Sequence, residues 1–206
     1  MNRRKIYLLT SMALAITLNY IGANLALFLH LPIYLDMIGT LLLSLLLGPW
    51  VGAATAMSSA LLSWLTSDAF ALFYAPVAMV TALLSGFFLR HNSRAKEIVW
   101  KAFCISLPGT ALAALITVSL FKGITSSGSS LLVQVLHSLG LNLTASVLLV
   151  QMTSDYLDRF ISLALVLAVI KNLKIQTSSL LKTTSEISHL LVKNGIILGL
   201  LRSDKR

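Results

Sequence analysis

Long apolar runs alternate with short polar breaks along the whole chain. Several runs approach the ~20 residues that an α-helix needs to cross a bilayer. Gly48 and Pro49 separate the second run from the third, because proline cannot continue a helix. The pattern predicts helical spans at about residues 5–29, 33–47, 50–65, 75–90, 99–121 and 156–170.

One further apolar run, residues 131–150, has a different pattern. Gln134, Ser138 and Asn142 recur every four residues, and His137 lies beside them. Such a polar stripe is typical of a helix that lies over the outer mouth of a membrane protein or dips into it, where polar atoms find partners. We therefore expect this segment not to cross the membrane.

The distribution of basic residues supports the same count of crossings. Both ends of the chain are basic, and seven crossings would put them on opposite sides of the membrane, against the positive-inside tendency. With six crossings, fourteen of the sixteen Lys and Arg residues face the cytoplasm, among them the basic loop at residues 90–96. Only Lys122 and Arg159 then lie outside. We expect an all-α integral membrane protein of the cell membrane, with six transmembrane helices, both termini cytoplasmic, and an additional extracytoplasmic or re-entrant helix before the last span.

Composition excludes an ordinary soluble domain. The 206 residues are 57% hydrophobic and 11% charged, against roughly 45–50% and about 25% in soluble domains, and the mean hydropathy is +0.87. The net charge of +9 fits basic residues at the headgroups of the lipid bilayer, so we expect no nucleic acid partner. Residues 1–173 are predicted to form a six-helix membrane domain, and residues 174–206 a basic cytoplasmic tail that is either an amphipathic helix or disordered.

Polar side chains gather at the outer ends of these spans. A charge near the membrane core costs roughly 2.5–3.5 kcal/mol on insertion scales, so Asp36 should be paired, hydrogen-bonded or facing water. We place it in the first turn of the second helix, where the helix dipole favours a carboxylate. Asp155 can be the N-cap of the last helix, with Arg159 as its ion-pair partner. Asn19, inside the first span, needs a partner from another helix or from a bound molecule.

Two further groups of residues have more than one interpretation. Four aromatic residues at the outer ends are either interfacial belt residues or pocket walls: Tyr34, Trp64, Tyr74 and Tyr156. Small residues four apart form flat faces on the first and third spans, which serve either internal packing or docking of a separate membrane partner. These small residues include Ser11, Ala15, Gly52, Ala56 and Ala60.

Motifs for catalysis and metal binding are missing from the sequence. It has no GxxxxGK[ST] phosphate loop, no HExxH and no GxSxG nucleophile elbow. The single cysteine, Cys104, excludes an internal disulfide and a cysteine-rich metal site. We expect no enzymatic activity, no metal and no cofactor of its own.

Three blocks of sequence carry a family resemblance. They are LPIYLDMIGTLLLSLLLGPWVGA, APVAMVTALLSGFF and SDYLDRFISLALVLAVIKNL. Together they resemble the membrane-embedded substrate-binding subunit, the S component, of energy-coupling factor (ECF) vitamin transporters. The likeness covers about residues 18–173, and LPIYLDxIGT and LLGPWxGA are its most specific parts.

The resemblance implies a working complex and a pocket. It implies six spans and a vitamin pocket that opens outward, bounded by the loops after the first, third and fifth spans. The expected partners are a transmembrane T component and two cytoplasmic ECF ATPases, which use ATP and Mg. Docking in the family uses an AxxxA-like motif on the first span, carried here onto Ser11 and Ala15, and the serine departs from that pattern.

The resemblance is closest to S components for pantothenate, with riboflavin or another B vitamin as alternatives. A pantothenate carboxylate needs a cation, for which Arg159 is the first candidate and Lys122 and His137 are reserves; Asn142, Tyr74 and Asp36 could serve its hydroxyls. A stand-alone secondary transporter is the alternative function. The candidate substrate-binding residues are Asn19, Tyr34, Asp36, Trp64, Ser67, Tyr74, His137, Asn142, Tyr156 and Arg159.

Overall fold

The computed structural model describes residues 3–89 and 97–193, with side chains up to residue 172. Every regular element in these residues is a helix, which confirms the predicted all-α fold. The basic loop at residues 90–96 and the end of the tail, residues 194–206, lie outside the described residues. The helices are α1 (Arg3–Phe28), α2 (Ile38–Leu46), α3 (Pro49–Thr66), α4 (Ala75–Leu89), α5 (Ile98–Phe121), α6 (Ser129–Ser138) and α7 (Leu143–Lys193).

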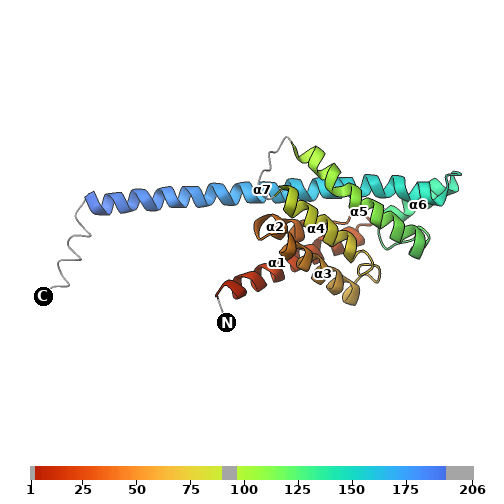
Figure 1. Ribbon diagram of the computed structural model, residues 1–206, viewed down its shortest axis with the longest axis horizontal. Helices are drawn as coiled ribbons and strands as arrows, with labels where there is room; N and C mark the ends of the chain where they lie inside the picture. Colours follow the sequence, from red (N-terminus) through yellow and green to blue (C-terminus); the bar gives the residue numbers. More distant parts are fainter. Residues whose placement is uncertain (1–2, 90–96, 194–206) are drawn as a thin grey trace. The chain divides into compact units, whose positions relative to one another are not determined.

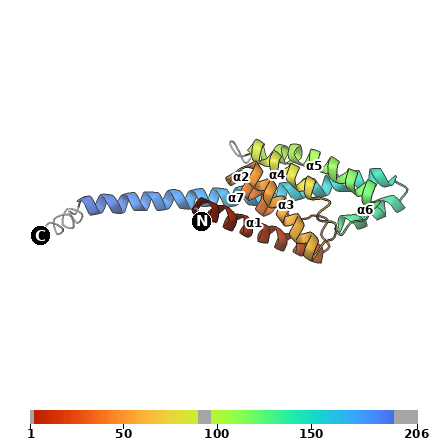
Figure 2. The ribbon, with the colours of Figure 1, turned by 60° about the horizontal axis from the view of Figure 1, so that its bottom comes forward.

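Four of the helices lie side by side. The order across the row is α1, α3, α4 and α5, and the short helix α2 packs against α1, α3 and α4 (Figures 1 and 2). The start of α7 closes the arrangement through an apolar cluster in which Val147 and Val150 meet Ala114 of α5 and Val133 of α6. The chain divides into two compact units, Met1–Val166 and Leu167–Arg206. The first unit holds all of the features described below.

The first unit is apolar outside and partly polar inside. Only 11% of the most apolar window of α1 is buried, and large side chains such as Leu14, Ile21 and Phe28 are exposed. Hydroxyl residues such as Thr40 and Ser85 are fully buried. A soluble protein shows the reverse distribution, whereas helices in lipid place small and hydroxyl residues between them. Of the described helices, α1 and α5 are long and apolar enough to cross a membrane, and α4 is a shorter apolar helix.

Helix α2 begins later than the sequence predicted, at Ile38 rather than residue 33. Leu35 has a φ of 53°, which a helix does not tolerate. The backbone N–H groups of Tyr34 and Leu35 donate to the Asp158 carboxylate, at 3.0 and 2.7 Å. A contact with a distant helix thus keeps this segment out of α2. The prediction that Asp36 lies in the first helical turn was wrong, because Asp36 lies in the loop before it.

The apolar run at residues 131–150 is also not one helix. It is divided between α6 and α7, because Gly140 takes a φ of 98° and its N–H bonds to the His137 carbonyl. The Asn142 side chain then accepts a hydrogen bond of 3.0 Å from the Thr144 N–H and so caps the start of α7. Gln134 and Asn142 therefore do not share a helix face. Residues 174–193 of the predicted tail continue α7 as helix.

Candidate ligand-binding cavity

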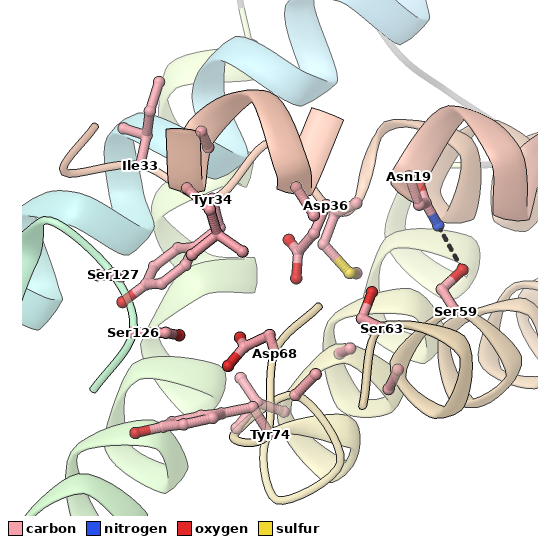
Figure 3. A pocket seen from close by; sticks show the side chains of 18 of the residues that line it. Asn19, Ile33, Tyr34, Asp36, Ser59, Ser63, Asp68, Tyr74, Ser126 and Ser127 are labelled. Atoms are coloured by element: carbon pink, nitrogen blue, oxygen red, sulfur yellow. Dashed lines mark hydrogen bonds between the residues drawn. The ribbon is translucent and has the colours of Figure 1, made fainter. Parts of the chain in front are cut away.

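A cavity lies between helices α1, α3, α4, α5 and α7 and the loops that precede α2, α4 and α6. The empty space within the cavity and its open mouth is about 1050 Å³, a volume that includes the solvent at the mouth. Its lining is mostly apolar, with polar groups converging from several elements. Figure 3 shows the Asp36, Asp68, Tyr34 and Tyr74 side chains pointing into this space.

Asn19 ties three helices together at one end of the cavity. Its Oδ1 accepts the N–H of Gly39 at 2.7 Å and that of Thr40 at 3.3 Å, two of the unpaired donors in the first turn of α2. Its Nδ2 donates to the Thr40 hydroxyl at 2.7 Å and to the Ser59 hydroxyl at 2.9 Å (Figure 3). This buried amide of α1 accepts N–H groups in the first turn of α2, whose N-cap residue is Met37, and its hydrogen-bonding capacity is filled within the protein.

The loop between α1 and α2, residues 29–37, is fastened to α7 by Asp158. The Asp158 side chain is fully buried, and its Oδ1 accepts the two loop N–H groups of Tyr34 and Leu35. The left-handed conformation of Leu35 costs about 1–2 kcal/mol, which these hydrogen bonds to a charged acceptor offset. The loop is therefore held over the cavity in one conformation.

A stripe on α7 supplies the polar wall of the cavity. Gln151, Asp155 and Arg159 are four residues apart and all line it, because residues at this spacing share a helix face. Arg159 forms a buried ion pair with Asp158, its neighbour on the same helix. Asp155 accepts a hydrogen bond of 2.9 Å from the Thr110 hydroxyl of α5. Asp155 lies inside a continuous helix, so the N-cap interpretation was wrong.

Asp36 is the carboxylate with an unfilled acceptor. Its Oδ1 is removed from solvent and has no hydrogen-bond partner among the described residues. Burial raises the pKa of Asp36 to about 6; the nearby Asp158 carboxylate adds to the rise and Arg159 opposes it. The side chain is thus a negative charge, held at a cost, that faces the cavity.

Tyr34 and Tyr74 form aromatic walls. The Tyr74 hydroxyl lies 2.6 Å from the Thr117 hydroxyl, and its ring stacks on Phe121 with centroids 6.1 Å apart. The Tyr34 hydroxyl lies 3.4 Å from that of Ser129. Burial raises the pKa of Tyr34, and it raises the pKa of Tyr74 to about 12, so both phenols stay neutral at physiological pH.

The structure brings six of the ten predicted substrate-binding residues to this cavity. They are Asn19, Tyr34, Asp36, Ser67, Tyr74 and Arg159. The other four do not line it. Trp64 is 42% exposed, His137 and Asn142 are exposed and bonded to nearby backbone, and Tyr156 packs edge-on against Phe103.

The small residues predicted for partner docking lie in different surroundings. The backbone of Ala15 lies against Gly39 of α2. Gly52 of α3 packs on Ser44, which is also a residue of α2. Ala56 and Ala60 line the cavity, and Ser11 is partly buried. Ala15 and Gly52 thus serve packing within the chain.

Sequence reasoning missed two of the polar lining residues on α7, Gln151 and Asp155. Their spacing from Arg159 was the available signal, because the three residues recur every four positions. The predicted start of a helix at residue 156 hid this four-residue spacing, because that start put Asp155 at a helix terminus and Gln151 on another segment. Asp158, which holds the loop, was concealed in the same way.

Comparison with known proteins places the chain among membrane domains. A family model described as 5TMR of 5TMR-LYT matches residues 1–156, about three quarters of the chain. No curated protein and no solved structure matches it. The family model covers every helix from α1 to α6 and the start of α7, including Asp155 of the cavity wall.

Proposed function

We propose that this chain, a member of the 5TMR of 5TMR-LYT family of multi-span membrane domains, is a membrane-embedded substrate-binding protein. In this proposal it crosses the membrane six times and captures a small water-soluble molecule at the outer face. It acts as the S component of an ECF-type importer, and its substrate is a B vitamin. The matched family is not a family of ECF S components, so the assignment to an ECF importer rests on the resemblance in the sequence.

The observation that carries the proposal is the cavity itself. It opens to solvent, and polar groups from the α1–α2 loop, the turn before α4 and helix α7 converge on its mostly apolar walls. A small-molecule site needs such a combination, because the apolar walls supply affinity and a few fixed polar groups supply orientation. A protein that only packs against other helices has no need of an open polar cavity.

The partners follow from what the chain lacks. Its sequence has no phosphate-binding loop, so in this proposal the ATP hydrolysis that drives delivery of the substrate takes place in partner subunits. The proposal assigns this work to a T component and two cytoplasmic ATPases. The apolar outer face of α1, with Leu14, Ile21 and Phe28 exposed, is a surface that a membrane partner or lipid can cover.

The charges of the cavity bear on which vitamin is bound. Arg159, the cation expected to meet a pantothenate carboxylate, already pairs with Asp158. Asp36, Asp68 and Asp155 line the same cavity. A carboxylate ligand would meet three carboxylates and a cation that is already neutralised. This distribution favours vitamins without a carboxylate over pantothenate.

Calorimetry with the purified full-length protein tests the proposal. Titration with a panel of B vitamins in the absence of ATP should reveal binding tighter than micromolar for one of them. The protein should also co-purify with a T component and two ATPases when all are expressed together. If no vitamin binds tighter than micromolar and no ATPase co-purifies, the proposal is wrong.

A stand-alone secondary transporter is a second candidate, because α7 carries two buried carboxylates. Asp155 and Asp158 are 3% and 0% exposed and lie within the helix rather than at its end. Buried acids within membrane helices are typical of ion-coupling and proton-relay sites. Uptake into vesicles that contain only this protein, driven by a proton or sodium gradient, would replace the first proposal with this one.

A further inference from the structure

The cavity has a net negative lining. Its described lining holds the carboxylates of Asp36, Asp68 and Asp155 and the guanidinium of Arg159. Arg159 is paired with Asp158, which lies just behind the wall. Together these four acids and one base leave an excess of negative charge in a site with apolar walls, where charges interact strongly.

The three lining carboxylates differ in how far they are satisfied. Asp155 accepts the Thr110 hydroxyl, and Asp68 accepts the Phe70 N–H at 3.0 Å in a turn of its own loop. Asp36 Oδ1, in contrast, is buried without a partner. A buried acceptor left in this way is costly unless something binds it. Asp36 is therefore the group that most needs a donor from a ligand.

Aromatic rings complete the surroundings. Tyr34 and Tyr74 line the same cavity as Asp36 and Asp68 (Figure 3). The Tyr74 ring is fixed by its hydroxyl bond to Thr117 and by stacking on Phe121. The face of an aromatic ring attracts a cation within about 6 Å of its centre. Carboxylates and aromatic walls in one pocket are the combination that recognises organic cations.

A metal ion is a poorer occupant than an organic cation. Across residues 3–89 and 97–172, no group of three or more His, Cys, Asp or Glu side chains is placed to hold a metal. A hard metal ion needs several oxygen ligands at short distances. An organic cation instead needs one or two carboxylates and apolar contact, which this cavity offers.

We infer that the ligand of this cavity carries a positive charge on nitrogen, as a protonated amine whose N–H groups can donate to Asp36. The charge is held by Asp36, with Asp68 nearby, and the apolar part of the molecule packs against Tyr34 and Tyr74. This inference rests on the proposed function, since it names the chemical class of the molecule that the substrate-binding protein captures.

Three probes that share one ring separate the charge from the shape. Full-length protein in lipid nanodiscs is titrated at pH 7.5 with benzylamine, which is protonated at this pH, benzyl alcohol and benzenesulfonate, and binding is followed by calorimetry and thermal shift. The cation should bind best and the anion should not bind. Tighter or equal binding of the sulfonate overturns the inference, and so does the absence of cation binding at millimolar concentration.

Variants test the residue that holds the charge. Asp36→Asn should weaken binding of the cation by roughly tenfold to hundredfold, because an amide is a poor partner for a cation, and should leave benzyl alcohol unaffected. Glu97→Gln is the matched control, since Glu97 pairs with Lys101 and does not line the cavity. Unchanged cation affinity in a folded Asp36→Asn protein contradicts the assignment.

A second pair of variants tests the aromatic wall without removing a charge. Tyr74→Phe keeps the ring and should retain cation binding, whereas Tyr74→Leu should weaken it severalfold. Equal effects of the two substitutions contradict the role of the ring.

The vitamin panel distinguishes this inference from the proposed function. If protonated benzylamine binds in an Asp36-dependent manner and no vitamin binds, the proposed function fails and the inference stands. If an anionic or neutral vitamin binds tightly and the cation probe does not, the inference fails and the proposed function stands.

Discussion

Two asparagines on α1 show how position decides the role of a buried amide. Asn19 is 1% exposed and bonds to α2 and α3, whereas Asn24 donates only to the Tyr20 carbonyl of its own helix, at 2.8 Å. The first amide joins three helices. The Asn24 amide forms its hydrogen bond within its own helix, so its loss should change the free energy of unfolding very little.

Replacement of Asn19 by alanine should therefore lower the free energy of unfolding by about 1–3 kcal/mol, because buried donors and acceptors on Gly39, Thr40 and Ser59 lose their partner. Asn24→Ala is the control and should change it by less than about 0.5 kcal/mol. Denaturant unfolding in detergent measures both. An equal decrease in the free energy of unfolding for both variants would show that the hydrogen bonds of Asn19 to α2 and α3 add no stability beyond that of the local bond of Asn24.

Asp36 should make the ligand-free protein less stable at neutral pH. Its pKa is raised to about 6 in the folded protein, so the stabilising contribution of the protonated form is present below the unfolded value, near 3.8, and is lost as the pH rises through about 6. Asp36→Asn should therefore raise the melting temperature at pH 7.5 by several degrees and have almost no effect at pH 4. An equal effect at both values would contradict the raised pKa.

The sequence was enough to select Asn19, Asp36 and Arg159 as site residues, because a polar residue between apolar runs is conspicuous. Their partners could not be predicted. Arg159 pairs with its neighbour Asp158 rather than with Asp155, and the Asn19 side-chain contacts with Thr40 and Ser59 join residues 21 and 40 positions apart in the chain. Such contacts depend on how the helices pack, which periodicity does not encode.

At the scale of elements, apolar runs predicted the helices that lie in the middle of the chain but not the boundaries set by distant contacts. Helices α3 to α5 follow their apolar runs closely. The start of α2 is delayed by Asp158, and the break between α6 and α7 depends on the conformation of Gly140. A shift of a few residues at these two boundaries was enough to change the assigned roles of Asp36 and Asp155.

The contact between α1 and α2 depends on the absence of a side chain at Gly39. A Cβ atom there would lie 2.2 Å from the Ala15 carbonyl oxygen, which is backbone and cannot rotate away. Gly39→Ala should therefore destabilise the protein by about 1–3 kcal/mol through forced separation of the helices. Gly109→Ala is the control, since its Cβ would meet the Thr81 hydroxyl at 3.1 Å and alanine favours the helix.

Thermal unfolding of both glycine variants checks this prediction. The control should stay within about 1 kcal/mol of the parent. If Gly39→Ala is as stable as the control, the two helices are not held at this distance in the membrane.

At the scale of the whole molecule, membrane character could be predicted from composition, and family membership agrees with it. The number of crossings and their orientation stay predictions, because the distribution of Lys and Arg indicates them only statistically. Among the described helices, α1 and α5 are long and apolar enough to span the membrane, and α4 is a shorter apolar helix. Helices α2, α3 and α4 pack against one another.

Cysteine labelling tests the predicted topology. In a Cys104→Ser background, single cysteines in place of Lys5 and Lys171 should react from the cytoplasmic side, and those in place of Ala69 and Ser138 from the outside. All four positions are exposed or lie in a loop. Reaction of Lys5→Cys and Lys171→Cys from opposite sides would overturn the even number of crossings.

The attachment of the α1–α2 loop to Asp158 limits the rate at which an enclosed molecule can leave, rather than its affinity. The N–H groups of Tyr34 and Leu35 lie in a loop, yet their acceptor is a buried side chain on another helix. Their exchange with deuterium should be slow, because it requires the loop to detach from α7. A molecule enclosed by this loop cannot leave past it faster than the loop detaches, so the rate of detachment sets a lower limit on the residence time along that route.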